Sequence, residues 1–190
     1  MADARVEQKI GSVLPDVALP LVAPAGGAWR LHDVAKQHRG VMLIFWSSVC
    51  SHCNRYDDYL NTFAARHPGV ALTGIASRQG EAVDDVRKAM EARGLTFPML
   101  YDAGSLIANQ LFTQQTPRVF LVDAAATLRY RGAIDNFKYP EDHEFEPYLE
   151  PAVESMLAGS AIARPETPSF GCAINSVYYT IPKPLGKRLL

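Results

Sequence analysis

The stretch FWSSVCSHC, residues 45–53, ends a continuous apolar run and carries two cysteines three positions apart. The run Val41–Trp46 is rich in branched and aromatic residues, which is typical of a strand covered on both faces. After Cys50, apolar side chains recur at helical spacing as far as Arg66, where a His-Pro-Gly sequence ends the pattern. We therefore predict a central strand that leads into a helix, with both cysteines in the first turn of that helix.

Upstream of this strand, the sequence has the pattern of an N-terminal β-hairpin. Strands are predicted over Asp16–Leu21 and Trp29–His32, joined by a turn at Ala25-Gly26-Gly27. A short helix then ends near Gly40. The hairpin is therefore an extension that precedes the central strand.

Downstream, strands and helices alternate. The predicted elements are a strand Val70–Ala76, a helix Glu81–Arg93, an extended segment Thr96–Leu100, a helix Ser105–Phe112, strands Arg118–Asp123 and Leu128–Gly132, and a helix between Pro147 and Ala158. This order implies a right-handed βαβ unit followed by an antiparallel hairpin in one sheet, which is the thioredoxin arrangement. We predict an α/β thioredoxin-like domain over residues 1–163, with its core at about 40–158 and the hairpin at about 11–39, followed by a C-terminal tail over 164–190.

Composition narrows the class of protein. A chain of 190 residues can bury one substantial core, and a net charge of −1 without a basic cluster makes nucleic acid an unlikely partner. No apolar run approaches the roughly 18–20 residues that span a bilayer, so we expect no transmembrane segment. The first ten residues are charged and lack the apolar region of a secretory signal, although a leader could have been removed.

Three stretches together resemble the TlpA-like branch of the thioredoxin superfamily, within the AhpC/TSA redoxins. They are residues 45–53, Gly94–Asp102 and Thr116–Asp123, and the resemblance covers about residues 11–158. It implies a thiol-disulfide oxidoreductase that exchanges a Cys50–Cys53 disulfide with the thiols of partner proteins, without a cofactor. It also implies an extracytoplasmic, periplasmic setting if a leader was removed, with the cytoplasm as the alternative.

The spacing of the cysteines assigns them different roles. A helix N-terminus carries unpaired N–H groups and partial positive charge, so it stabilises a thiolate at Cys50 and makes that residue the nucleophile. Cys53 lies one turn further along, where its sulfur is adjacent and more shielded, as a resolving thiol requires. The pair can therefore attack a partner disulfide and release the reduced partner.

Residues around the pair are candidates for tuning or substrate binding. Between the cysteines lie Ser51 and His52, and His52 can add positive charge beside the thiolate, which predicts a less reducing potential than that of thioredoxin; the alternative is an exposed helix residue. The family resemblance implies a cis peptide bond between Thr116 and Pro117, in a loop that faces the cysteines and pairs with the substrate backbone. Trp46 either flanks the site or belongs to the core.

The proton acceptor for Cys53 is not identified by the sequence. TlpA-like reductases often carry a glutamate three residues after the second cysteine, but Tyr56 occupies that position here. The predicted central strand holds no carboxylate either.

The third cysteine, Cys172, has two interpretations. It is either an apolar thiol packed under the tail or an auxiliary thiol that folds back toward Cys50. The spacing of the residues does not decide between them.

The cysteine pattern is also compatible with three rival functions. A peroxiredoxin-like peroxidase using Cys50 would be expected to carry the pattern P-x-x-x-T-x-x-C, but Leu43 and Ser47 occupy the proline and threonine positions. A metal-binding module using Cys50, His52 and Cys53, perhaps with Cys172, lacks the second ligand pair of a structural zinc site, so we expect no metal. A purely structural disulfide across so short a loop would stabilise the fold little.

Overall fold

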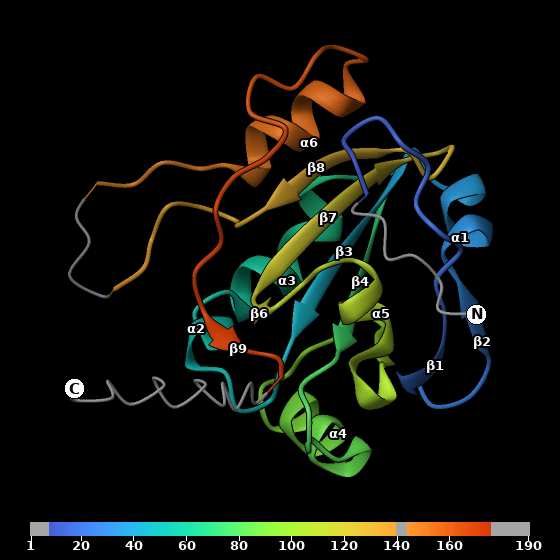
Figure 1. Cartoon of the computed structure of the whole chain (residues 1–190), viewed down its shortest axis with the longest axis vertical. Coiled ribbons are helices and arrows are strands. Elements are labelled where there is room, and N and C mark those ends of the chain that lie inside the picture. The colour runs from blue at the N-terminus through green and yellow to red at the C-terminus, as the bar shows by residue number, and fades with distance from the viewer. Residues whose placement is uncertain (1–7, 140–143, 176–190) are drawn as a thin grey trace, which may run out of the picture.

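The computed structural model describes residues 8–139 and 144–175, and its centre is a mixed β-sheet (Figure 1). The strand order is β2-β1-β5-β4-β3-β7-β8. Strands β3, β4 and β5 are parallel, whereas β7 runs antiparallel to β3 and β8 antiparallel to β7. The seven strands are β1 Ala18–Ala23, β2 Ala28–Arg30, β3 Gly40–Trp46, β4 Val70–Ala76, β5 Met99–Tyr101, β7 Arg118–Asp123 and β8 Leu128–Gly132. The predicted mixed sheet of the thioredoxin fold is confirmed.

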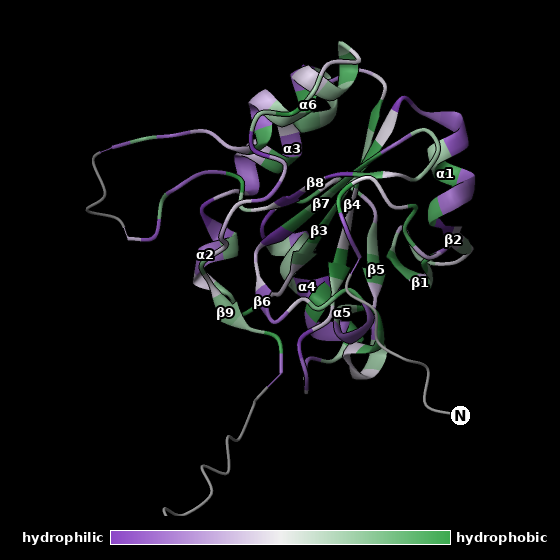
Figure 2. Ribbon diagram, turned by 45° about the horizontal axis from the view of Figure 1, so that its top comes forward, coloured by the Kyte–Doolittle hydropathy of each residue, from purple (hydrophilic) through white to green (hydrophobic). Residues whose placement is uncertain are grey.

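Every residue of β3 is buried, as its continuous apolar sequence predicts for the centre of a sheet. It pairs with β4 on one side and β7 on the other. The central strands are the most hydrophobic part of the ribbon (Figure 2). The N-terminal hairpin, β1 and β2, joins the sheet through an antiparallel pairing with β5, so the predicted extension lengthens the sheet beyond the βαβ unit.

Helices cover both faces of the sheet. Buried side chains of α3, α4 and α6 share one apolar cluster, and those of α1 and α5 share the other. The helices are α1 Leu31–Gln37, α2 Ser51–Asn54, α3 Asp57–Arg66, α4 Val83–Ala92, the 3₁₀ turn η1 Ala103–Ser105, α5 Leu106–Gln110 and α6 Leu149–Leu157. The sheet is therefore sandwiched between two helical layers.

The sequence predicts one continuous helix from Cys50 to Arg66, and this prediction is wrong. The segment divides into α2 and α3, and the backbone leaves helical geometry at Tyr56, where φ is −102° and ψ is 7°. The Tyr56 hydroxyl donates a hydrogen bond to the buried carboxylate of Asp135 at 2.6 Å. This contact with a residue 79 positions away fixes the side chain at the break.

The chain after α6 returns to the opposite end of the sheet. Within it, β9 Cys172–Ala173 pairs antiparallel with β6 Gln115–Thr116, forming a separate two-stranded sheet. Figure 1 shows β9 beside β6 and close to α2. Within the predicted tail, residues 164–175 are described, and they include the third cysteine; residues 176–190 lie outside the described residues.

Candidate active site

The two cysteines of the C-x-x-C sequence lie at the end of β3, in the turn that leads into α2. Cys50 is the N-cap of α2, and the backbone N–H of Cys53 donates to the carbonyl oxygen of Cys50 at 3.0 Å. Their exposed fractions are only 0% for Cys50 and 1% for Cys53. Neither sulfur is part of a disulfide in this structure, so it represents the reduced pair.

The two thiols have opposite pKa shifts. The hydrogen bond from the Cys53 thiol is the largest cause that lowers the pKa of Cys50. Together with hydrogen bonds from Cys172 and Thr116 it exceeds the opposing effect of burial and brings this pKa to about 4. Burial, followed by the adjacent Cys50 sulfur, raises the pKa of Cys53 well above its usual value. At neutral pH the pair therefore consists of a Cys50 thiolate and a protonated Cys53.

The source of the low pKa of Cys50 differs from the sequence-based argument. That argument placed Cys50 at the N-terminus of a long helix, whose peptide dipoles would favour a thiolate. Because α2 is a single short turn of four residues, no long helix is aligned behind Cys50. Side chains from three separate segments, those of Cys53, Thr116 and Cys172, favour the thiolate instead.

Thr116 and Pro117 face the cysteines, in the arrangement that the resemblance implies. The peptide bond between them is cis. The protonated Cys50 thiol can donate to the carbonyl oxygen of Thr116, which lies 3.2 Å from its sulfur. The Thr116 hydroxyl is buried and makes no hydrogen bond of good geometry within the described chain, so it can turn toward a Cys50 thiolate.

The other candidate residues have different surroundings. Ser51 is exposed, and the ring of His52 packs edge-on against Phe170, with 5.1 Å between ring centroids. Trp46 is fully buried in the same apolar cluster as both cysteines, and the Arg93 guanidinium lies 4.7 Å from its ring centroid. Trp46 is therefore a core residue of the cluster that also contains both cysteines.

Sequence reasoning left the position of Cys172 open, and the structure brings this residue to the site. Cys172 is the partner of Thr116 in the β6–β9 register, and its side chain and backbone both lie within hydrogen-bonding reach of Cys50. Burial, and then the Cys50 sulfur, raises the pKa of Cys172. The structure therefore gathers all three cysteines of the chain.

Sequence reasoning gave Glu81 no role at the site, since an acidic residue near a helix start is explained by the helix dipole alone. Its carboxylate is buried and accepts a hydrogen bond from the backbone N–H of Ser48 at 2.5 Å. It also lies 3.4 Å from the hydroxyl of Ser47. Glu81 therefore fixes the turn immediately before Cys50.

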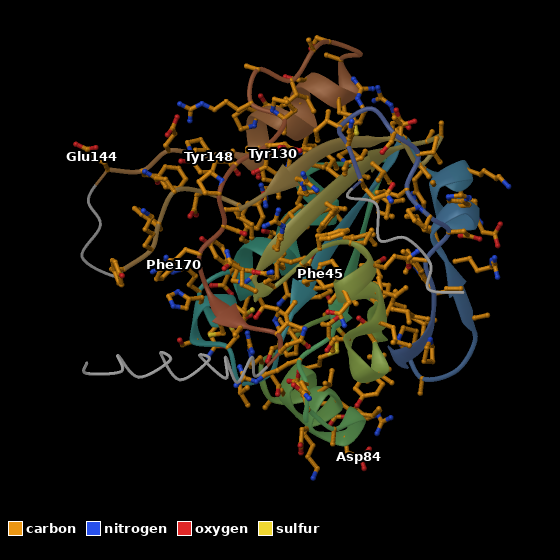
Figure 3. All side chains as sticks on the ribbon, viewed as in Figure 1. Phe45, Asp84, Tyr130, Glu144, Tyr148 and Phe170 are labelled. Carbon is orange, nitrogen blue, oxygen red and sulfur yellow. The ribbon has the colours of Figure 1, made fainter. Side chains whose placement is uncertain are left out.

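A pocket of about 450 Å³ lies beside the cis-proline loop. Its lining includes the hydrogen-bonded pair Tyr56 and Asp135, together with Pro117, Tyr148 and Phe170. Figure 3 shows Tyr148 and Phe170 on the side of the molecule that carries α2 and β9. Aromatic and polar groups thus adjoin the redox centre on one side.

Two further searches cover only the described part of the chain. Within residues 8–139 and 144–175, no group of three or more His, Cys, Asp or Glu side chains is arranged to hold a metal ion. Over the same residues, every helix is too short or too polar to cross a membrane.

Comparison with known proteins agrees with this geometry. Residues 10–131 match the model of the AhpC/TSA family. The chain belongs to the AhpC/TSA family. This result confirms the family resemblance inferred from the C-x-x-C segment and the cis-proline strand.

Two proteins of similar sequence have names that refer to disulfide chemistry. The chain is 32% identical over 114 residues to the thiol-disulfide oxidoreductase ResA of Geobacillus thermodenitrificans, covering 60% of this chain and 63% of that protein. It is 27% identical over 145 residues to the thiol:disulfide interchange protein DsbE of Escherichia coli K12, covering 74% of each chain. The match therefore spans somewhat less than two thirds of ResA.

One similar solved structure extends the likeness over most of this AhpC/TSA chain. It is that of a hypothetical protein, SMc02350, from Sinorhizobium meliloti 1021, with a TM-score of 0.78 and 26% identity. The superposition covers 89% of this chain and 95% of that one. The shared architecture thus reaches well beyond the segment matched in ResA.

Proposed function

We propose that this AhpC/TSA protein is a thiol-disulfide oxidoreductase that exchanges a Cys50–Cys53 disulfide with the thiols of partner proteins. The observation that carries the proposal is the opposite ionisation of two adjacent buried sulfurs, a low-pKa Cys50 and a high-pKa Cys53. Only a thiolate is an effective nucleophile, and a neighbouring protonated thiol can resolve the resulting mixed disulfide. The names of ResA and DsbE support the same chemistry.

The catalytic cycle follows from these ionisation states. The Cys50 thiolate attacks a partner disulfide, forms a mixed disulfide and releases one partner thiolate. Formation of that bond removes the negative charge of Cys50, which is one of the causes of the high pKa of Cys53. Cys53 then loses its proton more easily, to solvent or to the partner thiolate released in the first step. It attacks the Cys50 sulfur and releases the second partner thiolate, leaving the Cys50–Cys53 disulfide.

The direction of electron flow depends on the relative stability of the reduced pair. A low pKa at Cys50 stabilises the reduced form at neutral pH, because that form carries the thiolate. This argument predicts a reduction potential above that of thioredoxin, which is about −270 mV. The protein is then a better oxidant of partner thiols than thioredoxin. The sequence predicts the same direction from the charge of His52, but the side chains that lower the pKa of Cys50 here are those of Cys53, Cys172 and Thr116.

The direct test is the reduction potential of the pair, measured in Cys172→Ser protein so that only two cysteines remain. The protein is equilibrated with glutathione buffers of graded ratio, quenched in acid, alkylated and analysed by mass spectrometry. Cys50→Ser and Cys53→Ser proteins, each also carrying Cys172→Ser, are the matched controls. A reversible two-electron transition is expected only when both cysteines are present, and absence of a reversible Cys50–Cys53 disulfide would reject the proposed function.

The cellular setting is part of the proposal. An extracytoplasmic location is supported by the resemblance to TlpA-like proteins, and an oxidising compartment would suit an oxidant of partner thiols. Expression of the complete gene followed by cell fractionation distinguishes this location from the cytoplasm. Recovery of the protein only with cytoplasmic markers would contradict the extracytoplasmic location and leave the chemistry of the pair unaffected.

A further inference from the structure

The segment of residues 165–175, here called the strap, passes over the redox centre and is anchored on both sides of it. Before the centre, the N–H of Arg131 donates to the carbonyl of Pro165 at 2.9 Å. After it, the N–H of Gln79 donates to the carbonyl of Ile174 at 2.8 Å, and the Ile174 side chain is 1% exposed in the cluster beneath α1 and α5. The strap is therefore hydrogen-bonded to the rest of the fold on both sides of the site.

The strap approaches the cis-proline loop so closely that a side chain would not fit at Gly171. A Cβ atom there would lie 1.9 Å from the carbonyl oxygen of Thr116 and 3.2 Å from Cδ of Pro117. The next residue, Cys172, pairs with Thr116, whose carbonyl oxygen is also 3.2 Å from the Cys50 sulfur. The glycine thus allows the backbone approach that brings the Cys172 and Cys50 sulfurs together.

The strap also decides which sulfur is reachable from solvent. Cys50 is completely buried and Cys53 is 1% exposed, whereas Cys172 is partly exposed. Phe170 extends the cover by packing on the ring of His52, the residue between the two buried cysteines. With the strap in this position, Cys172 is the residue of the three that has appreciable exposed surface, so a partner protein meets it before Cys50.

We propose that Cys172 is a third redox-active cysteine, which exchanges with Cys50 to form a solvent-facing Cys50–Cys172 disulfide. The inference rests on the proposed oxidoreductase function and adds the route by which partners reach the pair. In the exchange, the Cys172 thiolate attacks the Cys50 sulfur of the Cys50–Cys53 disulfide. The Cys50–Cys172 bond forms, the Cys50–Cys53 bond breaks, and Cys53 leaves with the electron pair and takes up the proton that Cys172 gave away. The oxidation level of the chain is unchanged.

The ionisation of the three thiols is compatible with both steps of this route. One cause of the raised pKa of Cys172 is the Cys50 sulfur, and its charge is absent when Cys50 is in a disulfide. Burial still raises the pKa of Cys172 in that state, whereas the backbone N–H of His52 and the charge of Arg78 lower it. When a partner thiolate attacks the Cys172 sulfur of the new disulfide, Cys50 departs as a low-pKa thiolate, which is a good leaving group.

The first experiment maps disulfides in Cys53→Ser protein after oxidation with glutathione disulfide and an acid quench. An intramolecular Cys50–Cys172 disulfide is expected in more than half of the molecules. The matched control, Cys53→Ser with Cys172→Ser, should carry glutathione on Cys50 or remain reduced. Folded Cys53→Ser protein with no Cys50–Cys172 disulfide would overturn the inference, and mapping of oxidised wild-type protein provides the same test if that variant does not fold.

The second experiment measures the rate at which reduced glutathione reduces the fully oxidised protein. Removal of the Cys172 thiol by Cys172→Ser should slow reduction at least tenfold, because only the buried Cys50–Cys53 disulfide remains. Equal rates would overturn the proposed route. The two proposals can fail separately. If Cys172→Ser protein still forms a reversible Cys50–Cys53 disulfide but Cys53→Ser protein forms no Cys50–Cys172 disulfide, only the redox role of Cys172 is rejected. Failure of the Cys50–Cys53 pair itself rejects the proposed function.

Discussion

Gly171→Ala should expose Cys50 by forcing the strap away from the cis-proline loop. The added Cβ would lie 1.9 Å from the oxygen and 2.7 Å from the carbon of the Thr116 carbonyl. Both atoms are backbone, so no flexible side chain can move aside. The strands β6 and β9 must therefore separate by about 1 Å, which is enough to break hydrogen bonds of ordinary length.

The size of the effect follows from the interactions lost. The separation disrupts the short β6–β9 ladder and its extension, in which the N–H of Ile174 donates to the carbonyl of Gln114 at 2.9 Å. Loss of about two hydrogen bonds at roughly 0.5–1.5 kcal/mol each favours strap opening by about 1–3 kcal/mol. Because about 1.4 kcal/mol is a factor of ten, the open population should increase roughly 5- to 150-fold.

The assay measures the rate at which iodoacetamide alkylates Cys50 in reduced protein, with the modified peptide quantified by mass spectrometry. When the strap opens and closes faster than alkylation, this rate is proportional to the open population. Ala173→Ser is the matched control, because Ala173 lies on the same strand and is exposed. A folded Gly171→Ala protein whose Cys50 reacts within twofold of wild type would refute the idea that the strap controls access.

Three further outcomes are expected. Between the folded pKa of Cys50, about 4, and its higher unfolded value, the unfolded state binds more protons. The free energy of unfolding of reduced wild-type protein should therefore exceed that of Cys50→Ser protein by the full amount above the unfolded pKa. This difference should fall as pH decreases and vanish below about pH 4, and urea denaturation across this range measures it. Thr116→Val should raise the pKa of Cys50 by about 1–2, measured by thiolate absorbance, because a hydrogen bond to a charged group contributes about 1.5–3 kcal/mol. Tyr56→Phe should cost about 1–3 kcal/mol in urea unfolding, because Asp135 loses a buried donor.

Most strands of the sheet were predictable because the local sequence of each strand shows which of its residues are buried. The strands at Val70–Ala76, Arg118–Asp123 and Leu128–Gly132 begin and end where the sequence predicts. Their apolar runs are bounded by turn residues, so both position and length are encoded nearby. The hairpin strands were displaced by one or two residues, since the exposed face of β1 gives only a weak alternation.

The division of the active-site helix was not predictable from local sequence. The helical spacing of apolar residues continues across Arg55 and Tyr56, and neither residue is a helix breaker. The break coincides with the bond from Tyr56 to Asp135, which lies in the loop after β8. A contact between residues so distant in sequence leaves no periodic signal.

The two cysteines of the pair were predictable as candidates, but their surroundings were not. Their spacing and their position after a buried strand nominated them. The position of Cys172 depends on β9 pairing with β6, a pairing of two residues on each strand that propensity cannot reveal. The available signal was Gly171, since a glycine within an extended apolar segment often marks a close approach of backbones.

The strap connects the protection of Cys50 to its ionisation. A buried thiolate is costly unless hydrogen-bond donors replace water, and here the donors include Cys172, which belongs to the strap itself. Opening the strap would therefore expose the nucleophile and also remove one of the groups that keep its pKa low. Exchange through Cys172 reduces this conflict, because the residue that meets the partner is already partly exposed while Cys50 keeps the hydrogen bonds from Cys53 and Thr116 that make it a good leaving group.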